Sequence, residues 1–538
     1  MITKYDYTLE TAEEQDSSIN ARPLHELFDE RARANPGGVA FEDSGRSYKF
    51  KEVQDYSMAL SSWMLDNGIT KGDIISLYMT SSTAFSIAHI AASRIGALIS
   101  PLHMTYGKKE LTELISFSGS KLLITDLSYS GKDLYQKVKE VADSVHMDKI
   151  LANVNEIPVL EGWESFWDVC RNYKHENNYP TVMPSDPIGL FFTSGTETGE
   201  PKGCIHTHSS MMGNAMSVCI DSEIDKNSVI ISGSAFSHLF GILSLHASLI
   251  SGSKNVIVKR FNAEEFLRLA ASYKPTHVFL VPTELRDIVN LVEKSYNPFT
   301  NAKEFRIAGA ELPHDLAKEF IDNVSGNLVN HWGMTELGAG SYTRHGDNSD
   351  TILGCIGKPV NGANVAILSS ENKLVVNEVG EILYRGPSLF KGYYKLPGYT
   401  KNCTIEINGK RWFRTGDLGL VDENGILRYI GRKKDIINRG GMKINSREVE
   451  RILEGMKGID TVCVVPVPDS RLGERACLFY STSAKIGKEE ITEYLNSKDV
   501  AKYKWPEYFV VESNMPRTPT GKIAKGKLAQ KAKMMFDH

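Results

Sequence analysis

The chain has 538 residues, of which 41% are hydrophobic and 24% are charged, and its formal net charge is −4. This is ordinary usage for a soluble globular protein, and the length exceeds what one compact core holds, so we expect two or more folding units. The small negative charge gives no electrostatic basis for binding nucleic acid or an anionic membrane.

The N-terminal segment 1–18 is polar and acidic, so it does not read as a secretory signal. The longest apolar run, 241–250, is far too short to span a membrane. The seven cysteines are scattered with no Cys-x-x-Cys pair, which suits buried or free thiols in a reducing compartment better than disulfides or a zinc site. We therefore expect a cytoplasmic protein without a transmembrane segment. Peripheral membrane contact stays open, and so does the oligomeric state, with a homodimer as one candidate.

Short Ile/Val/Leu runs alternate with longer amphipathic segments, a pattern that predicts an α/β fold with largely parallel strands. Residues 73–79 read as a buried strand, and 82–95 as a helix with Ser/Thr at its start and Gly96 just past its end. Further strands are expected at 98–102, 121–126, 229–232, 255–258, 276–281 and 328–330.

The pattern changes from about residue 354, where short runs divided by Gly, Asn and Asp predict a smaller β-rich section. It changes again after Gly431, where a basic segment precedes a helix at 446–453 and a strand at 461–467. We therefore predict an N-terminal core over 1–431 and a C-terminal domain over 432–538, with a boundary at 432–435. An ordinary surface loop at this place is the alternative.

The strongest local signal is TSGTETGEPKG over 193–203, which follows an apolar run ending at Phe192. Small hydroxyl residues and glycines let backbone N–H groups surround an anion, and Lys202 adds a positive charge. A helix expected near 207–212 would add its positive N-terminal dipole. No G-x-x-x-x-G-K-[ST] pattern fits, which disfavours a P-loop kinase or GTPase. Taken alone, such a segment is more often a plain turn.

Four later segments add chemistry-bearing residues: NHWGMTE at 330–336, WFRTGD at 412–417, GRKKD at 431–435 and PRTPTGK at 516–522. Each alone has an ordinary structural explanation as a turn, a cap or a solvated charge. In this order they resemble the adenylate-forming superfamily of acyl-CoA synthetases, firefly luciferases and nonribosomal-peptide adenylation domains. GALISPLHMTYGKKEL near Gly96, SHLFG from Ser237, AGAELP from Ala308, GEILYRGP from Gly380 and VVPVPDSRLGE from Val464 extend the resemblance over nearly the whole chain.

The resemblance implies an α/β fold with a large N-terminal domain of parallel-rich βα subdomains plus a β-rich section, and a small mobile α+β C-terminal domain. It also implies an AMP-forming acid–CoA ligase. In that reaction a carboxylate and ATP give acyl-AMP and pyrophosphate, and coenzyme A then gives acyl-CoA and AMP. The implied cofactors are ATP and Mg²⁺, with coenzyme A as co-substrate and a small-molecule carboxylic acid as partner.

The same resemblance assigns the nucleotide site. The residues expected to hold the β- and γ-phosphates are Thr193, Ser194, Gly195, Thr196 and Lys202. Thr335 would hydrogen-bond the α-phosphate and Glu336 would ligate Mg²⁺. The residues expected to line the adenine slot are Gly309, Ala310, Glu311, Asn330, His331 and Trp332, the last in place of the family's usual stacking tyrosine.

Asp417, helped by Arg432, would bind the ribose hydroxyls, and Lys522 would bridge the carboxylate and the α-phosphate as the main catalytic residue. Lys434 matches the family's hinge residue, and Gly440 and Gly441 match the loop beside the pantetheine tunnel.

The residues expected to line the acyl pocket are His238, which would also position the acyl carboxylate, Phe240, Gly241, Gly333 and Met334. Acetate-specific relatives have a tryptophan where this chain has Gly333. The open position favours a medium- or long-chain fatty acid, a branched acid or an aryl acid.

One departure from the family lies in the phosphate loop, which is one residue longer than the usual TSGTTGxPKG. Glu197 and Glu200 are expected to point away from the triphosphate because an acidic side chain beside it would be repelled. The alternative functions are a stand-alone adenylating ligase that loads a carrier protein, a luciferase-type oxygenase and a non-catalytic nucleotide-binding sensor.

Overall fold

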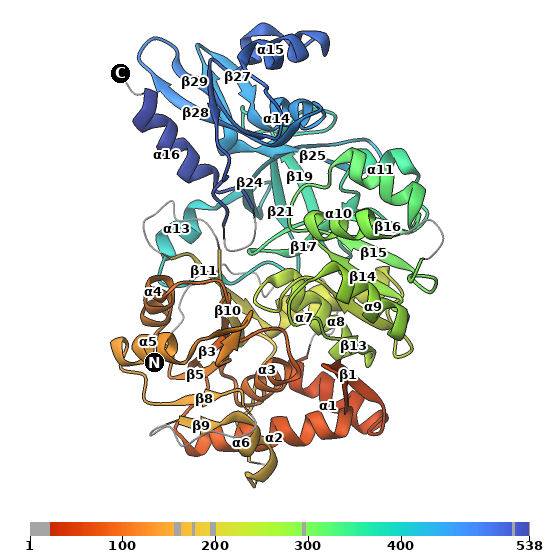
Figure 1. Ribbon diagram of the computed structural model, residues 1–538. Helices are drawn as coiled ribbons and strands as arrows, with labels where there is room; N and C mark the ends of the chain where they lie inside the picture. The colour runs from red at the N-terminus through yellow and green to blue at the C-terminus, as the bar shows by residue number, and fades with distance from the viewer. Residues whose placement is uncertain are drawn as a thin grey trace. The chain divides into compact units, whose positions relative to one another are not determined.

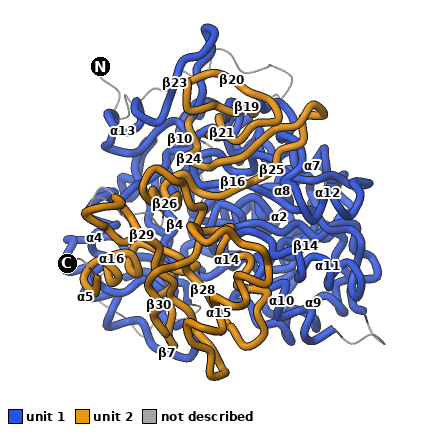
Figure 2. Tube along the Cα trace, turned by 90° about the horizontal axis from the view of Figure 1, so that it is seen from above, with its two compact units in different colours: residues 1–364, 384–413 blue, residues 365–383, 414–538 orange. Residues whose placement is uncertain are grey.

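The structure is a computed structural model that describes residues 22–154, 163–174, 178–193, 201–292, 297–518 and 522–536. It is a mixed α/β fold, which confirms the predicted fold class (Figure 1). The chain divides into unit 1, residues 1–364 and 384–413, and unit 2, residues 365–383 and 414–538 (Figure 2). The hinge expected at 432–435 lies within unit 2, at the 3-10 turn Lys433–Asp435, and its role stays a prediction.

Unit 1 contains an eight-stranded sheet in the order β22-β11-β10-β4-β3-β5-β8-β9. The strands are β3 (Ile74–Tyr78), β4 (Leu98–Pro101), β5 (Leu122–Thr125), β8 (Ile150–Ala152), β9 (Trp163–Ser165), β10 (Pro187–Phe192), β11 (Gly203–Thr207) and β22 (Gly392–Tyr393). They run parallel from β10 to β9, whereas β11 is antiparallel to both of its neighbours. The strands predicted at 73–79, 98–102 and 121–126 are confirmed.

The second large sheet of unit 1 has nine strands in the order β18-β17-β16-β15-β14-β12-β13-β1-β2. They are β1 (Val39–Asp43), β2 (Arg46–Lys49), β12 (Val229–Ser232), β13 (Lys254–Val256), β14 (His277–Leu280), β15 (Glu304–Ile307), β16 (Leu328–Met334), β17 (Gly338–Tyr342) and β18 (Lys358–Pro359). The strands from β1 to β16 are parallel, and antiparallel strands complete each edge. The carboxyl ends of β15 and β16 therefore lie on one edge of this sheet.

Helices cover these sheets. Those of unit 1 are α1 (Leu24–Ala34), α2 (Phe50–Asp66), α3 (Thr83–Ile95), α4 (Lys108–Ser118), α5 (Tyr135–Ser144), α6 (Phe166–Asn172), α7 (His208–Asp221), α8 (Leu239–Ser251), α9 (Ala263–Tyr273), α10 (Pro282–Leu291), α11 (His314–Asn323), α12 (Ser349–Gly354) and α13 (Pro397–Asn402). Helix α3 is buried along its whole length and packs against α1 and α2 (Figure 1). It begins at the Ser82 cap and ends at Gly96, whose φ of 71° is the left-handed conformation that favours glycine, as predicted.

The β-rich section predicted after residue 354 is confirmed by β19 (Asn364–Leu368), β20 (Leu374–Val375), β21 (Gly380–Arg385), β23 (Thr404–Ile407), β24 (Lys410–Val421) and β25 (Leu427–Arg432). The C-terminal part of unit 2 has a five-stranded sheet of β26 (Ile436–Arg439), β27 (Met442–Asn445), β28 (Ile459–Asp469), β29 (Gly473–Thr482) and β30 (Tyr508–Val511). Its helices are α14 (Ser446–Glu454), α15 (Lys488–Ser497) and α16 (Lys525–Phe536). Unit 1 also contains a small hairpin of β6 (Ser128–Tyr129) and β7 (Lys132–Asp133).

In the part of the chain that the structure describes, no helix is both long and apolar enough to cross a membrane. All seven cysteines lie in that part, and none forms a disulfide. Burial raises the pKa of Cys219 and Cys477 to about 12, and it also raises the pKa of Cys170 and Cys204. These thiols are free in the structure, and the reducing compartment stays a prediction.

Candidate functional site

The lysine of the expected phosphate loop is fixed at the start of β11. The backbone N–H of Thr193 donates to the Lys202 carbonyl at 2.9 Å and closes the base of the connection from β10. The Lys202 side chain is 6% exposed, its ammonium donates to the Tyr399 hydroxyl at 2.7 Å, and the same nitrogen lies 4.2 Å from the Tyr399 ring centroid. The loop residues Ser194, Gly195, Thr196, Glu197 and Glu200 lie outside the described residues.

Glu336 follows β16 at the carboxyl edge of the nine-stranded sheet and is 8% exposed. Its Oε1 accepts a hydrogen bond from the Tyr393 hydroxyl at 2.7 Å, and its backbone carbonyl accepts from the Phe390 N–H at 2.8 Å. A buried carboxylate is a fitting ligand for a hard cation such as Mg²⁺. The structure therefore supplies the donor chemistry that the sequence motif predicts at this position.

Thr335 is positioned by a histidine that the sequence argument did not single out. His206 Nε2 lies 2.7 Å from the Thr335 carbonyl oxygen. Because a carbonyl only accepts, Nε2 carries the proton. Burial lowers the pKa of His206 to about 4, so the ring is neutral near pH 7. His206 comes four residues after Lys202 on β11, and only the fold shows that this strand reaches the Thr335 backbone.

Two of the glycines expected in the acyl pocket are required by the backbone. A Cβ atom at Gly333 would lie 2.0 Å from the Gly338 carbonyl oxygen across the β16–β17 turn. One at Gly241 would lie 2.1 Å from the Ala235 carbonyl oxygen. Real side-chain carbons do not approach a backbone oxygen so closely. The missing side chain at Gly333 thus has a cause in strand packing that is independent of the acyl group.

Of the remaining acyl-pocket residues, His238 and Phe240 lie at the start of α8 and Met334 lies at the end of β16. The His238 ring centroid is 4.2 Å from that of His103, and His103 Nδ1 lies 2.8 Å from the Ser237 hydroxyl. The Phe240 ring packs at 5.5 Å against His331, a residue expected in the adenine slot. Met334 is partly exposed at the end of β16. The structure therefore places the expected acyl and nucleotide residues of β16 and α8 in contact.

Burial keeps several histidines of unit 1 uncharged. It lowers the pKa of His103 and His206 to about 4 and that of His89 to about 3, and His89 Nε2 lies 2.8 Å from His246 Nε2. In the unfolded chain each would titrate near 6.5, so below that pH the unfolded state binds protons that the folded state excludes. We expect the free energy of unfolding to fall by up to about 1.4 kcal/mol per pH unit for each such histidine as the pH drops from about 6.5 to about 4.

Urea unfolding followed at a series of pH values measures this slope. A free energy of unfolding that stays constant between about pH 6.5 and about pH 5 would contradict the expectation, because carboxylates with ordinary pKa values contribute little in that window.

Behind β16, a buried ion pair supports His331. Arg306 is 1% exposed, and its Nε lies 2.7 Å from Glu304 Oε1. One Arg306 nitrogen donates to the Ser222 hydroxyl at 2.7 Å, and another lies 3.5 Å from His331 Nδ1. A guanidinium only donates, so His331 Nδ1 is the acceptor and the proton is on Nε2. Burial, with Arg306 and Arg344, holds the pKa of His331 well below its ordinary value.

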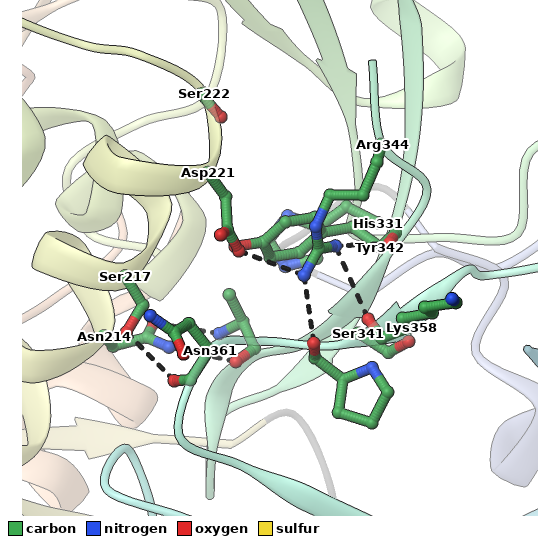
Figure 3. A network of polar contacts seen from close by, with 12 residues as sticks. Asn214, Ser217, Asp221, Ser222, His331, Ser341, Tyr342, Arg344, Lys358 and Asn361 are labelled. Atoms are coloured by element: carbon green, nitrogen blue, oxygen red, sulfur yellow. Dashed lines mark hydrogen bonds and ion pairs between the residues drawn. The ribbon is translucent and has the colours of Figure 1, made fainter. Parts of the chain in front are cut away.

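Tyr342 on β17 connects this ion pair to the surface. The Arg306 and Arg344 guanidinium carbons lie 4.1 Å and 3.9 Å from the Tyr342 ring centroid. The Tyr342 hydroxyl donates to Asp221 Oδ2 at 2.6 Å, and that carboxylate also pairs with Arg344 at 3.0 Å (Figure 3). These contacts between cations and an aromatic ring, together with the charge-assisted hydrogen bonds, hold β15 and β16 in place. Those two strands carry or lead to the residues expected in the adenine slot.

The remaining residues expected in the adenine slot are close to the same strands. Asn330 donates to the Cys355 carbonyl at 2.8 Å, and Trp332 is 7% exposed and packs over Gly340. Gly309 follows β15 with φ of 88°. Gly309 and Ala310 are exposed and Glu311 is partly exposed. Their contact with adenine stays a prediction.

Unit 2 brings Asp417, Arg432 and Lys522 together. Asp417 on β24 is 1% exposed, stands opposite Arg432 on β25, and its Oδ1 lies 2.8 Å from Arg432 Nε. Lys522 is an exposed residue, yet desolvation of its ammonium by the surrounding protein lowers its pKa. The Arg432 charge adds to this lowering and the Asp417 charge opposes it. Three residues taken from separate motifs thus share one electrostatic environment.

The residues expected at the hinge and the pantetheine tunnel have clear backbone roles. Lys434 is exposed in the turn Lys433–Asp435. Gly440 and Gly441 form the two-residue connection between β26 and β27, with φ values of 56° and 84°. A tight hairpin with positive φ at both positions strongly favours glycine. Their part in thiol transfer stays a prediction.

Comparison with known proteins extends these observations. The family model described as AMP-binding enzyme matches residues 28–394, and the model described as AMP-binding enzyme C-terminal domain matches residues 448–522. A medium-chain fatty-acid–CoA ligase of Escherichia coli strain K12 is 28% identical over 508 residues, covering 93% of this chain and 89% of that protein. A feruloyl-CoA synthase of Amycolatopsis sp is 26% identical over 509 residues, covering 93% and 97%.

Among solved structures, ATP-bound MatB from Rhodopseudomonas palustris superposes with a TM-score of 0.85 at 22% identity, covering 96% of this chain and 100% of that chain. This likeness establishes a common fold over nearly the whole length.

Proposed function

Because the chain belongs to the family of AMP-binding enzymes and is an AMP-forming acid–CoA ligase, we propose that it activates a medium- or long-chain fatty acid or an aryl acid in preference to acetate. The ATP-dependent activation of the acid is supported by the pair of buried charges, Lys202 and Glu336, which two tyrosines connect in unit 1. A fixed ammonium and a fixed carboxylate suit a bound triphosphate with its magnesium ion.

The first half-reaction joins two anions, so the protein must position them and offset their charge. A carboxylate oxygen of the acid attacks the α-phosphorus of ATP, and the bond to pyrophosphate breaks. Lys202 binds the outer phosphates, Thr335 orients the α-phosphate, and Asp417 with Arg432 holds the ribose. Glu336 would hold Mg²⁺, which when bound offsets phosphate charge. Lys522 bridges the acid and the α-phosphate as negative charge develops there.

The second half-reaction transfers the acyl group to sulfur. The thiolate of coenzyme A attacks the acyl carbon, and the bond to AMP breaks. We assign the hinge for a change of C-terminal domain orientation to Lys434, between an N-terminal domain over 1–431 and a mobile domain over 432–538. Gly440 and Gly441 border the pantetheine path. This assignment is supported by the motif positions and by the tight turn that the two glycines form.

The choice of acid follows from the apolar side chains near α8 and β16. Phe240 and Met334 offer an apolar wall, and His238 offers a polar group for the carboxylate. The names of the relatives include both fatty-acid and feruloyl acyl groups, which supports this range of acids. Because the backbone already demands glycine at 333, that position is not a useful place to test acyl size by substitution. We retain a reducing, cytoplasmic location as a prediction, supported by the scattered cysteines.

A panel of carboxylic acids, assayed for AMP release with and without coenzyme A, tests the proposal. We expect AMP release to require both ATP and an acid, to rise when coenzyme A is added, and to give a higher kcat/KM for medium-chain or aryl acids than for acetate. Glu336→Gln serves as the matched variant, because the amide keeps the shape of the side chain but loses the charge that a hard cation prefers.

Each other outcome has a distinct meaning. Acid-dependent pyrophosphate exchange without turnover by coenzyme A would indicate a ligase that loads a carrier protein. Nucleotide binding with no acid-dependent reaction would indicate a sensor. The highest kcat/KM for acetate would contradict the proposed acyl range.

A further inference from the structure

The segment 391–400 lies against the strand that carries the phosphate-loop lysine. Strand β22 pairs antiparallel with β11, with Tyr393 opposite Cys204. Three backbone or side-chain hydrogen bonds fix the segment: Tyr394 N–H to the Gly203 carbonyl at 2.8 Å, Lys391 N–H to the Ile205 carbonyl at 2.7 Å, and Tyr393 N–H to the Thr400 hydroxyl at 2.9 Å. Helix α13 then presents Tyr399 from the same segment. Both Tyr393 and Tyr399 are therefore held at defined places relative to Lys202.

Tyr399 restrains the Lys202 ammonium in two ways. Its hydroxyl accepts a hydrogen bond at 2.7 Å, and its ring face lies 4.2 Å from the nitrogen. Both contacts favour the charged ammonium without cancelling its charge. A buried lysine with four rotatable bonds otherwise loses much conformational freedom when it binds an anion. A partner that fixes the ammonium in advance lowers that cost for the ligand.

Tyr393 restrains Glu336 in a parallel way. Its hydroxyl donates to Glu336 Oε1 at 2.7 Å, because a carboxylate oxygen only accepts. A carboxylate with one oxygen held by a phenol has a fixed orientation. The Tyr393 and Tyr399 rings meet edge to face, with centroids 5.0 Å apart and an interplanar angle of 70°. This is a favourable aromatic geometry, so each ring limits the movement of the other.

We propose that Tyr399 and Tyr393 are positioning residues for the ATP site: Tyr399 holds Lys202 for the outer phosphates, and Tyr393 holds Glu336 for the cation. The proposal rests on the nucleotide site described under the proposed function. It adds a coupling between the two charged groups, because the paired rings transmit a displacement at one residue to the other.

Binding of ATP with Mg²⁺, measured by isothermal calorimetry on the full chain, tests the proposal directly. Tyr399→Phe keeps the ring and removes the hydroxyl, and we expect it to raise the Kd for ATP about tenfold. Tyr399→Leu removes both contacts and should raise the Kd further. Tyr393→Phe should raise the Mg²⁺ concentration needed for half-maximal ATP binding. A matched control is Tyr394→Phe, whose hydroxyl donates to the Ser118 carbonyl at 3.1 Å.

A double-variant cycle separates positioning from a general loss of structure. In a Lys202→Met background, Tyr399→Phe should have no further effect on the Kd for ATP. In Tyr399→Phe, acid-dependent exchange of pyrophosphate into ATP should show a higher KM for ATP and little change in the KM for the acid.

An unchanged Kd for ATP in Tyr399→Phe would overturn the proposal. So would a loss of ATP affinity that is equal in the presence and absence of the Lys202 ammonium. Because the binding measurement needs no acid, it decides this inference even if the acid panel rejects the proposed ligase substrates.

Discussion

Lys522→Ala is expected to lower the rate of acyl-adenylate formation about 10²–10³-fold, the usual cost of removing one electrostatic contact made in the transition state. The ammonium shares its surroundings with Asp417 and Arg432, the residues assigned to the ribose. Its charge would offset the negative charge that grows between the acid and the α-phosphate. Acid-dependent exchange of labelled pyrophosphate into ATP isolates this step from thiol transfer.

The expected loss belongs to the first half-reaction only. A preformed acyl-adenylate should still react with coenzyme A in the Lys522→Ala variant, because Lys522 has no assigned role in that step. Lys527→Ala is a suitable control, since Lys527 is an exposed lysine of the neighbouring helix α16. Exchange close to the wild-type rate, or an equal loss in both half-reactions, would contradict the assignment.

Arg306→Leu should lower the free energy of unfolding by about 3–5 kcal/mol, the range found when one partner of a buried ion pair is removed. Burial alone would raise the pKa of Glu304, but Arg306 and the Ser222 hydroxyl hold it below its ordinary value. Without Arg306, the Glu304 carboxylate must either bind a proton or remain charged in a low-dielectric interior. The His331 and Ser222 contacts would be lost together with the ion pair.

Urea unfolding of Arg306→Leu, Glu304→Leu and the double variant measures this effect. The double variant should be more stable than either single variant, because replacing both charges leaves no uncompensated group. Single variants with the same unfolding midpoint as the wild type would show that the pair contributes no such stability.

Local rules predicted the parts of the fold that depend on nearby residues. The strand at 73–79, the Ser82 cap and the Gly96 end of α3 follow from short apolar runs and from the capping preferences of single residues. The ordered motifs also led to the carboxylate Glu336 and the lysine Lys202, because charged residues at fixed spacing within a motif can be recognised from the sequence alone. The match to the AMP-binding enzyme family confirms the predicted family, whereas the roles of these two residues stay predictions.

Contacts between distant segments could not be predicted in this way. Tyr399 reaches Lys202 across 197 positions, and His206 reaches the Thr335 carbonyl across 129. No periodicity or spacing relates such residues, since their meeting depends on how β11, β16 and β22 are arranged in space. Gly333 shows a related limit of sequence analysis. The sequence predicted its role in the acyl pocket, but only the structure shows that a close approach of the backbone also requires glycine there.

The grouping of residues 365–383 with the C-terminal residues in unit 2 has the same origin (Figure 2). Sequence order assigns this segment to the N-terminal part, but β21 pairs with the later strand β24, which in turn pairs with β25 in one continuous sheet. Strand pairing is a long-range choice, so a boundary drawn from composition alone does not reveal it.

The shielded cysteines have a consequence for an enzyme whose second substrate is itself a thiol. Thiol–disulfide exchange requires a thiolate, and pKa values of about 12 at Cys219 and Cys477 leave almost none at neutral pH. Five of the seven thiols are also buried, which blocks the approach of an oxidised coenzyme A molecule. At these thiols the protein resists being covalently capped by the disulfide of its own co-substrate as the ratio of coenzyme A to that disulfide changes.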